Sequence, residues 1–343
     1  MLKKTFLTIL FSLFGFFLFS QNNDSLLFKP SGNVIVRTFF DFSQGFGKNS
    51  NKTGFNITRA FLGYSYQFTR TIDATVIIDG ASCNENGNIE PTLRNAYLSW
   101  TPSNLDLNIG GSELYQFSDQ EKYWRLRYLM PTFQALYNLG YPADWGITAK
   151  WKFNKFFAVD LSVTNGEGYK KLLQNASTRY AAGISIFPIN NFILRAYADI
   201  YNQSESMRDN LPADVTGAVK LVNQNVFSLF AGYKNSFFSG GIEYAKLWNK
   251  GFIQGKNIYG ASGFVSVNFA KQFLAFARCD LVFSQNPSEF TTNWNTTDGQ
   301  MFIAGVQFQP VKHLKIAPNF RFNNEKSVGK KNSYAFVSME FSL

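Results

Sequence analysis

The sequence predicts an all-β fold, a transmembrane antiparallel β-barrel of about 16 strands. Three observations support this: apolar and polar residues alternate, short and long connections alternate, and aromatic residues gather beside the short connections. The alternation is clear at the end of the chain, NSYAFVSMEFSL, where every second residue from Ala335 to Leu343 is apolar. A period of two is typical of a strand with one apolar and one polar face.

Residues 1–20 have the pattern of a signal peptide, which leaves residues 21–343 as one barrel domain. Lys3 and Lys4 precede an apolar run from Phe6 to Phe19, and Ser20 follows it. A charged start, an apolar core of about 7–15 residues and a small residue at the cleavage point are typical of secretion signals. The run is shorter than the ~20 residues of a membrane-spanning helix. We therefore expect the chain to be exported.

Strand signals divide the rest of the chain into alternating segments bounded by turn residues. The predicted strands are Val34–Phe42, Phe55–Phe68, Ile72–Asp79, Thr92–Trp100, Leu105–Gly111, Trp145–Phe153, Phe157–Thr164, Arg179–Phe187, Phe192–Tyr201, Val226–Tyr233, Phe238–Leu247, Ile258–Phe269, Phe273–Ser284, Gln300–Phe308, Leu314–Asn323 and Ser333–Leu343. Short links such as TRT, TPSN and AKQ occupy every second gap, and the other gaps are longer. This alternation is typical of outer-membrane barrels, with short periplasmic turns and long external loops.

Aromatic residues on the apolar face cluster near the short links, which predicts an interfacial girdle at one side of a membrane. They are Trp100, Phe153, Phe157, Tyr233, Phe238, Phe269, Phe273 and Phe308. Because Leu343 continues the alternation to the last residue, we expect the last strand to pair with the first and close the barrel. Pro318 lies within a predicted strand, and it suggests a bulge there.

Composition and the few reactive residues argue against other functions. Aromatic residues make up 17% and charged residues 16% of a chain with a formal net charge of +10, and the basic residues are spread along all the strands. Nucleic-acid binders usually cluster them on one face, so we expect no nucleic-acid partner. The single histidine, His313, lies in a short turn without a nucleophile beside it. We therefore expect no enzyme, no metal site and no cofactor. We also expect Cys83 and Cys279 to be free thiols, since their settings differ.

A barrel of about 16 strands retains an aqueous channel, so charges on the inward face become candidate pore-lining residues. The basic candidates are Arg37, Arg59, Lys150, Lys152, Arg179, Arg195, Arg278, Lys315 and Arg321. The acidic residues on the same face are Asp41, Asp73, Asp79, Asp160, Asp199, Glu243 and Asp280. Basic rings favour anions, and this near-balance predicts only a mild preference. The alternative is that these charges pair across the wall and rigidify it.

The longest connection, Ser112–Asp144, is too apolar to be surrounded by water. We expect it to fold into the barrel mouth, where its charged residues would form a constriction. These residues are Glu121, Lys122, Arg125 and Arg127. Two other roles stay open for this loop, a contact between subunits of a trimer and a sugar-stacking platform on Trp124 and Tyr128.

The stretches TRAFLGYSYQF, LRNAYLSW, QEKYWRLRYLM and VTNGEGYKK, in this order, resemble the phosphate-selective porin O/P family of Gram-negative outer membranes. The resemblance implies a sixteen-stranded, usually trimeric barrel with one loop folded into the pore. The family's arginine ladder and lysine cluster have no residue-by-residue match here. We expect an outer-membrane porin that passes small hydrophilic solutes, weakly prefers anions or phosphate, contacts outer-membrane lipid and forms a homotrimer. The alternative is a non-conducting barrel that acts in surface binding or assembly.

Overall fold

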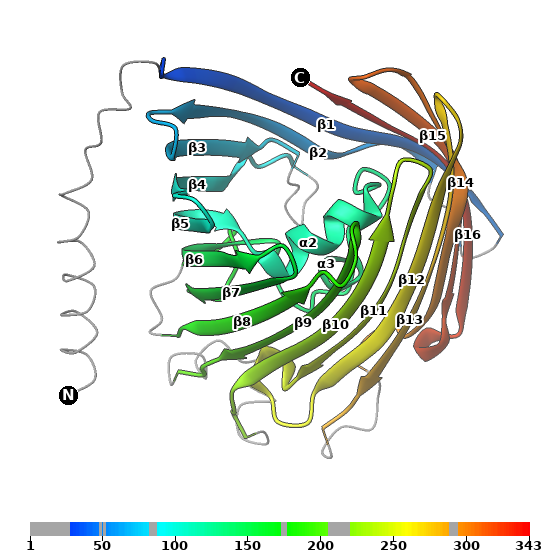
Figure 1. Cartoon of the computed structure of the whole chain (residues 1–343). Coiled ribbons are helices and arrows are strands. Elements are labelled where there is room, and N and C mark those ends of the chain that lie inside the picture. The colour runs from blue at the N-terminus through cyan, green and yellow to red at the C-terminus, as the bar shows by residue number, and fades with distance from the viewer. Residues whose placement is uncertain are drawn as a thin grey trace.

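The computed structural model describes residues 28–47, 50, 53–81, 88–172, 177–204, 220–287 and 294–343. The predicted signal peptide, residues 1–20, and Cys83 lie outside these described residues. Within them, sixteen antiparallel strands form one closed barrel, in which each strand pairs with its neighbours in the sequence (Figure 1). The predicted fold class is therefore confirmed.

The strands are β1 (Ser31–Phe46), β2 (Thr53–Gln67), β3 (Ile72–Asp79), β4 (Thr92–Trp100), β5 (Leu105–Glu113), β6 (Ala143–Asn154), β7 (Phe157–Thr164), β8 (Arg179–Ile186), β9 (Phe192–Tyr201), β10 (Gln224–Lys234), β11 (Phe238–Trp248), β12 (Asn257–Ala270), β13 (Phe273–Gln285), β14 (Gly299–Val311), β15 (Leu314–Glu325) and β16 (Lys330–Ser342). Within the described ranges the helices are α2 (Tyr115–Trp124) and α3 (Phe133–Leu136), and the 3-10 turns are η4 (Lys250–Phe252) and η5 (Lys326–Val328). No helix among the described residues is long and apolar enough to cross a membrane.

The first and last strands pair directly and close the barrel. Their register runs from Arg37 opposite Ser342 to Phe46 opposite Ser333. The backbone N–H of Leu343, just beyond β16, donates to the carbonyl of Val36 at 3.0 Å. Closure leaves no unpaired strand edge, which an apolar membrane would penalise. The regular alternation at the end of the sequence therefore has the expected structural cause.

Alternate residues of each strand face opposite sides of the wall. On β13, Leu274, Phe276 and Arg278 are buried inside, whereas Phe273 and Cys279 are exposed on the outer face. Cys279 is a free thiol, as predicted. The outer face is apolar over most of its height because large hydrophobic side chains occupy the exposed positions of nearly every strand.

The connections differ between the two ends of the barrel. At one end they contain two to five residues, and at the other six to 29, apart from the four residues between β15 and β16. The long last connection predicted from the sequence is therefore wrong, because β15 extends to Glu325 and β16 begins at Lys330. The tight link depends on Gly329, whose φ of 63° favours glycine.

The predicted gathering of aromatic side chains at the short-connection end is confirmed. Phe153 and Phe157 flank one short turn with their ring centroids 5.5 Å apart. Phe273 lies 5.9 Å from Phe269 and 4.9 Å from Phe308, again measured between centroids. These rings form an aromatic band at this end of the barrel, with one group on β6 and β7 and another on β12–β14.

Irregular pairing occurs where the sequence did not indicate it. Pro318 pairs opposite Val337 of β16, and the register is the same on both sides of it, so the predicted bulge is wrong. The proline lacks a donor, and pairing with β14 is interrupted there without a change of register. A register shift lies instead between Ile77 and Ile78 of β3, opposite β4.

Candidate functional site

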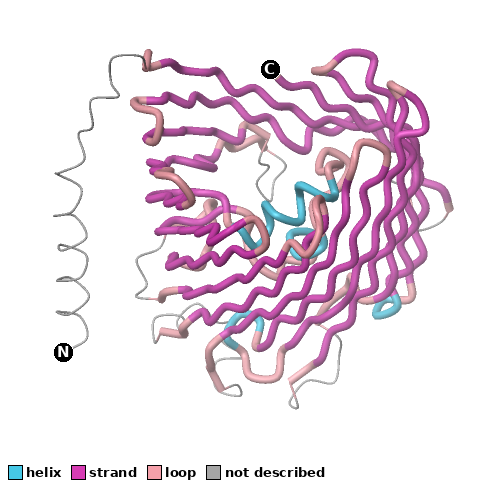
Figure 2. Tube along the Cα trace, viewed as in Figure 1, coloured by secondary structure: helices cyan, strands magenta, loops and turns pink. Residues whose placement is uncertain are grey.

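The connection between β5 and β6, residues 114–142, folds back into the barrel and places α2 and α3 in its interior (Figures 1 and 2). Inward folding was predicted, but the two helices were not. On α2, Gln116, Gln120 and Tyr123 recur at helical spacing and are all buried. The helix ends at Arg125, which adopts the left-handed conformation with a φ of 59°.

The segment after α2 packs on the wall through large apolar side chains. Trp124, only 1% exposed, joins Leu126 and Met130 in one buried cluster with strand residues such as Phe39 and Ile303. Its indole N–H donates to the carbonyl of Met130 at 2.7 Å, which closes this turn. The cluster covers the inner face of β1 and β13–β15. Burial of this kind is the main force that can hold a loop inside a wide barrel.

α3 packs on a second stretch of wall. Phe133 and Tyr137 are buried against Tyr197, Leu247 and Val282, which face inward from β9, β11 and β13. Together the two clusters cover the inner face of the barrel from β9 through β15 and on to β1. This side of the lumen is filled with protein.

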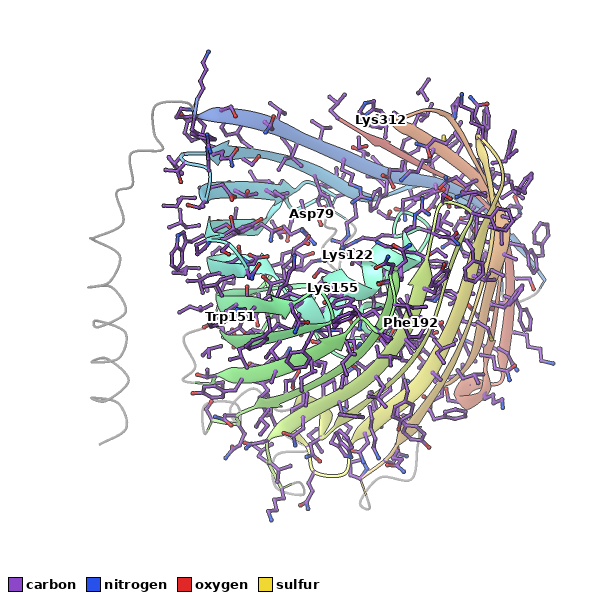
Figure 3. All side chains as sticks on the ribbon, in the orientation of Figure 1. Asp79, Lys122, Trp151, Lys155, Phe192 and Lys312 are labelled. Atoms are coloured by element: carbon purple, nitrogen blue, oxygen red, sulfur yellow. The ribbon has the colours of Figure 1, made fainter. Side chains whose placement is uncertain are left out.

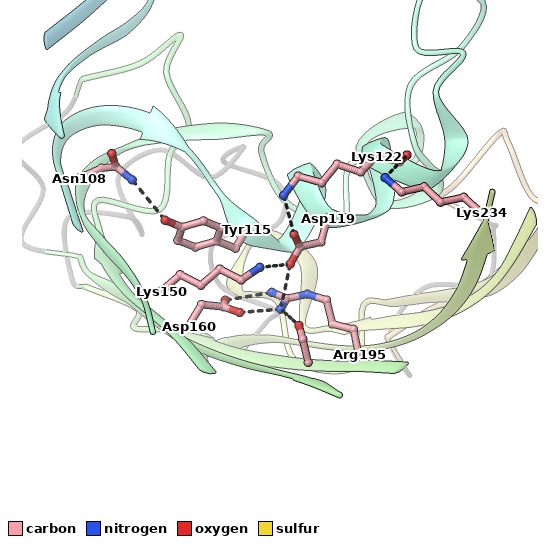
Figure 4. Close-up of polar contacts among 9 residues, drawn as sticks. Asn108, Tyr115, Asp119, Lys122, Lys150, Asp160, Arg195 and Lys234 are labelled. Carbon is pink, nitrogen blue, oxygen red and sulfur yellow. Dashed lines mark hydrogen bonds and ion pairs between the residues drawn. The ribbon is translucent and has the colours of Figure 1, made fainter. Parts of the chain in front are cut away.

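Asp119 of α2 lies at the centre of a buried charge network (Figure 4). Its carboxylate accepts a hydrogen bond from Lys150 Nζ of β6 at 2.5 Å and lies 3.4 Å from Arg195 Nη1 of β9. Arg195 also donates to both carboxylate oxygens of Asp160 on β7, at 2.5 and 2.9 Å. Lys122 completes the set with an ion pair to Asp119 at 3.0 Å.

The surrounding cations control the ionisation of Asp119. Burial acts to raise the pKa of its carboxyl, but Lys150, Arg195 and Lys122 outweigh burial and lower that pKa to about 2. The carboxylate is therefore charged at any pH near neutrality. Because its partners belong to β6 and β9, the network ties α2 to two strands of the wall.

A second polar contact lies further along α2. Glu243 of β11 is buried and accepts hydrogen bonds from the side-chain amides of Gln120 and Gln134. Gln134 in turn accepts one from Gln116 at 2.5 Å. α2 and α3 are thus joined to each other and to the wall by hydrogen bonds.

The nine basic candidate residues differ widely in their solvent exposure. Four of them, Lys150, Arg179, Arg195 and Arg278, are buried. Arg278 pairs with Asp280 at 2.7 Å and donates to the carbonyl of Pro131 in the loop at 2.6 Å. Their role in a pore stays a prediction, but their guanidinium and ammonium groups already have protein partners or aromatic neighbours.

Among the remaining candidates, Arg37 has 37% of its side chain exposed and pairs with Glu340, which Lys315 also contacts at 3.2 Å. Arg59 forms an ion pair with Asp79. Arg321 is stacked 3.7 Å from the ring of Phe336. Lys152 is exposed near the short-turn end of β6, on the same face as Lys150. The alternative weighed from the sequence was that these charges pair across the wall. Ion pairs with carboxylates are formed by Arg37, Arg59, Lys150, Arg195, Arg278 and Lys315.

The four predicted constriction residues lie inside the barrel on or just after α2. Arg127 donates to both oxygens of Glu121, at 2.6 and 2.7 Å, so this pair neutralises itself. Lys122, at 58% side-chain exposure, and Arg125 are exposed (Figure 3 labels Lys122). A narrowing of the lumen at this height stays a prediction, but these two cations are the ones that water reaches.

Sequence reasoning missed one inward-facing arginine, Arg94 of β4. Its side chain pairs with Glu113 at 2.9 Å, and its guanidinium carbon lies 4.9 Å from the ring centroid of Phe61. Strict alternation would place only one of Arg94 and Asn95 inside, whereas both are buried. The sequence did carry a signal of this irregularity. Leu93 and Leu98 are both apolar and both exposed on the outer face, yet an odd number of positions separates them, whereas residues on one face of a regular strand are an even number apart. That spacing requires a bulge.

A second loop also reaches into the barrel. Tyr169, in the connection between β7 and β8, is buried, and its hydroxyl accepts a hydrogen bond from Arg59 at 2.9 Å. The ring centroid of Tyr169 lies 6.0 Å from the guanidinium carbon of Arg94. The sequence indicated only a loop here. This contact ties the loop to β2 and β4.

The inner face of β2–β5 is polar and is not covered by the apolar clusters. It carries Ser65, Asp73, Tyr97 and Asp106 as partly exposed side chains. Tyr115 at the start of α2 approaches its edge through a 3.3 Å contact between its hydroxyl and the amide nitrogen of Asn108. Among the described residues the lumen is therefore asymmetric: apolar packing of the loop fills the β9–β15 side, whereas the β2–β5 side carries polar side chains, some partly exposed and others, such as Asp79 and Arg94, buried. No group of three or more metal-ligating side chains occurs in the described part of the chain.

This architecture matches solved outer-membrane channels. The outer-membrane channel DcaP of Acinetobacter baumannii superposes with a TM-score of 0.65 at 12% identity, covering 92% of this chain and 97% of that one. The chain has a porin fold. An anion-selective porin from Comamonas acidovorans gives a TM-score of 0.65 at 10% identity, with 92% and 100% of the two chains covered.

A third porin-fold neighbour is OmpT of Vibrio cholerae, described as a trimer form, with a TM-score of 0.62 at 10% identity and coverage of 92% and 100%. No family model matches the sequence. No curated protein matches it either. At these identities the likeness extends to the fold alone, so the narrower resemblance to the phosphate-selective O/P family is supported only as far as the porin fold.

Proposed function

We propose that this protein is a porin of a Gram-negative outer membrane through which small hydrophilic solutes diffuse passively, with no enzymatic step and no cofactor. One observation carries this proposal: among the described residues, the apolar packing of the loop lies on one side of a closed barrel, and the β2–β5 side keeps partly exposed polar side chains such as Ser65, Asp73 and Asp106. A barrel of this strand number has room for water beside such a loop. The apolar outer face and the aromatic band fit insertion into lipid.

We propose that solutes pass between the loop and the β2–β5 wall. On this route they would meet Arg37 and Lys122, with 37% and 58% of their side chains exposed, and Glu113, with 48% exposed. Asp73 and Asp106 add two further carboxylates. The exposed Arg125 and Lys152 add two further cations. Because cations only slightly outnumber carboxylates, we expect a weak anion preference rather than strict phosphate selectivity.

The proposal extends to export, orientation in the membrane and oligomeric state. Residues 1–20 would direct export, the long connections would face outward, and the short turns would face the periplasm. A homotrimer is proposed because one neighbour of the same fold is described as a trimer form.

The deciding experiment is conductance of the purified protein in a planar bilayer. A KCl gradient, applied with and without phosphate, gives the ion preference through the reversal potential. We expect stable steps of conductance, a small reversal potential of anion sign, and at most partial block by phosphate. A cation-signed reversal would contradict the anion preference, and strong block by phosphate would support the phosphate-selective assignment.

The second candidate function is a non-conducting barrel that acts in surface binding or assembly. The observation in its favour is the tight packing of the loop, including Trp124 at 1% exposure. Deletion of residues 119–128 distinguishes the two candidates. A plugged barrel should gain conductance from nearly none, whereas an open porin should change modestly.

A further inference from the structure

Three connections meet at the long-connection end of the barrel, above β10–β14. Residue Leu221 forms a β-bridge with Ile253, which lies between β11 and β12. The N–H of Gln254 donates to the carbonyl of Lys220 at 3.0 Å. Trp294, between β13 and β14, packs beside the buried cluster that contains α3. This end of the barrel therefore has an ordered rim on the side that the loop fills.

Two lysines of this rim approach the same aromatic ring. The ammonium nitrogen of Lys250 lies 5.4 Å from the ring centroid of Trp294, and that of Lys256 lies 5.0 Å from it. The backbone N–H of Lys250 donates to the carbonyl of Lys256 at 2.6 Å, which fixes the two backbones next to each other. A cation that lies near the face of an aromatic ring is attracted to it.

The scaffold around these side chains is rigid. Asn249 adopts the left-handed conformation with a φ of 58°, and its side-chain oxygen accepts from the N–H of Gly255 at 3.1 Å. The N–H of Gly251, whose φ is 67°, donates to the side chain of Gln224 at 2.9 Å. The indole of Trp294 donates to the carbonyl of Gln285 at 2.8 Å. Both lysines thus start from fixed backbone positions.

The charge of this cluster is not balanced by the described residues. No ion pair between described residues of the barrel includes Lys250 or Lys256. Burial and the neighbouring charge of Lys256 lower the pKa of Lys250 to about 8. Two neighbouring like charges in a partly buried setting repel each other, and a bound anion would relieve that repulsion.

We infer that Lys250, Lys256 and Trp294 form a binding site for an oxyanion, a phosphate or carboxylate group, at the long-connection mouth of the barrel. The two ammonium groups would donate to the oxyanion, and the indole would form an apolar wall beside it. Binding here does not depend on conduction. A role in concentrating anionic solutes at the mouth would rest on the proposed function.

Calorimetric titration with inorganic phosphate tests the site, using the full-length protein in a neutral detergent. We expect saturable binding that Lys256→Gln weakens about tenfold, the loss of one charge-assisted contact. Lys256→Arg should restore most of the affinity because it keeps the charge. Lys271→Gln is the matched control, since it removes an exposed lysine from a short turn at the opposite end of the barrel.

Two outcomes would overturn the inference. One is that phosphate shows no saturable binding, and the other is that the unchanged protein and Lys256→Gln bind phosphate with equal affinity. A repeat with added anionic lipid distinguishes the sources of the oxyanion. If anionic lipid competes with phosphate for the protein with Lys256 but not for Lys256→Gln, the result would support the site and assign it to a lipid headgroup. Bilayer conductance of the same preparation keeps the two proposals apart, because a silent channel that still binds phosphate would contradict only the porin function.

Discussion

Asp119 of α2 and Lys150 of β6 form a buried ion pair, with 2.5 Å between carboxylate oxygen and ammonium nitrogen. The pair joins the middle of the inserted loop to the wall, and the side chains of both residues are less than a tenth exposed. Together with the apolar clusters it makes the loop a fixed partition of the lumen. A fixed partition predicts a steady open channel rather than one that gates.

Replacing Asp119 by Asn should loosen the partition. The change leaves the ammonium group of Lys150 buried without an ion-pair partner, which typically costs roughly 3–5 kcal/mol. We expect a lower unfolding midpoint in urea and larger current fluctuations in single channels. Lys122→Gln is the control, because its exposed pair with the same carboxylate contributes at most about 1 kcal/mol. Equal noise in the two variants would show that the apolar packing alone holds the loop.

If the barrel conducts as proposed, the same carboxylate predicts how its current responds to acid. Its pKa in the folded protein is about 2, below the value of about 3.9 expected for an unfolded chain. The stabilisation is therefore complete above roughly pH 4 and is lost as the pH falls through about 2. Channel noise should stay constant from pH 7 to pH 4 and rise below about pH 3. In Asp119→Asn the rise should be absent, and a rise near pH 5 would contradict this account.

Single cysteines can trace the route of solutes, in a background with Cys83 and Cys279 changed to Ser. Ser65 of β2 is partly exposed on the uncovered face, whereas Ser228 of β10 is 2% exposed beneath the loop side. A charged thiol reagent should modify Ser65→Cys and reduce its conductance. Ser228→Cys should remain unmodified. Rapid modification of both would mean that water fills the β10 side as well.

Asp73 of β3 should oppose the proposed anion preference. It is partly exposed, and no ion pair of the described residues includes it. Charges act on passing ions within about one Debye length, ~10 Å at 0.1 M salt. Asp73→Asn should therefore shift the reversal potential toward anions. Lys312→Gln, a charge change in an exposed turn (Figure 3 labels Lys312), should leave the potential unchanged. An identical reversal potential for Asp73→Asn would place the route elsewhere.

The fold was predictable because a membrane barrel repeats one local rule along its whole length. Residues such as Leu343 and Phe273 alternate with inward-facing residues, and that period needs no knowledge of distant contacts. The rule fails locally where a strand carries an extra residue. Arg94 was missed for this reason, since the register shift at β3 and β4 turns two successive side chains inward.

The candidate site was only partly predictable. The sequence indicated that the loop carrying Trp124 must be buried, because so many apolar residues cannot remain in water. It could not indicate that Asp119 would meet Lys150 and Arg195, which belong to different strands, or that Arg278 would bind the loop backbone. Such partners depend on where the chain crosses the barrel.

The sequence by itself determined the strands, their two faces, the closure by the last strand and the burial of the long loop, because periodicity and hydrophobicity act locally. Only the tertiary structure decided which charges are exposed. Arg195 and Arg37 look alike in the sequence, yet one is buried in a network with Asp160 and the other is partly exposed. The difference arises because the loop packs on one side of the wall, and only a three-dimensional arrangement defines that side.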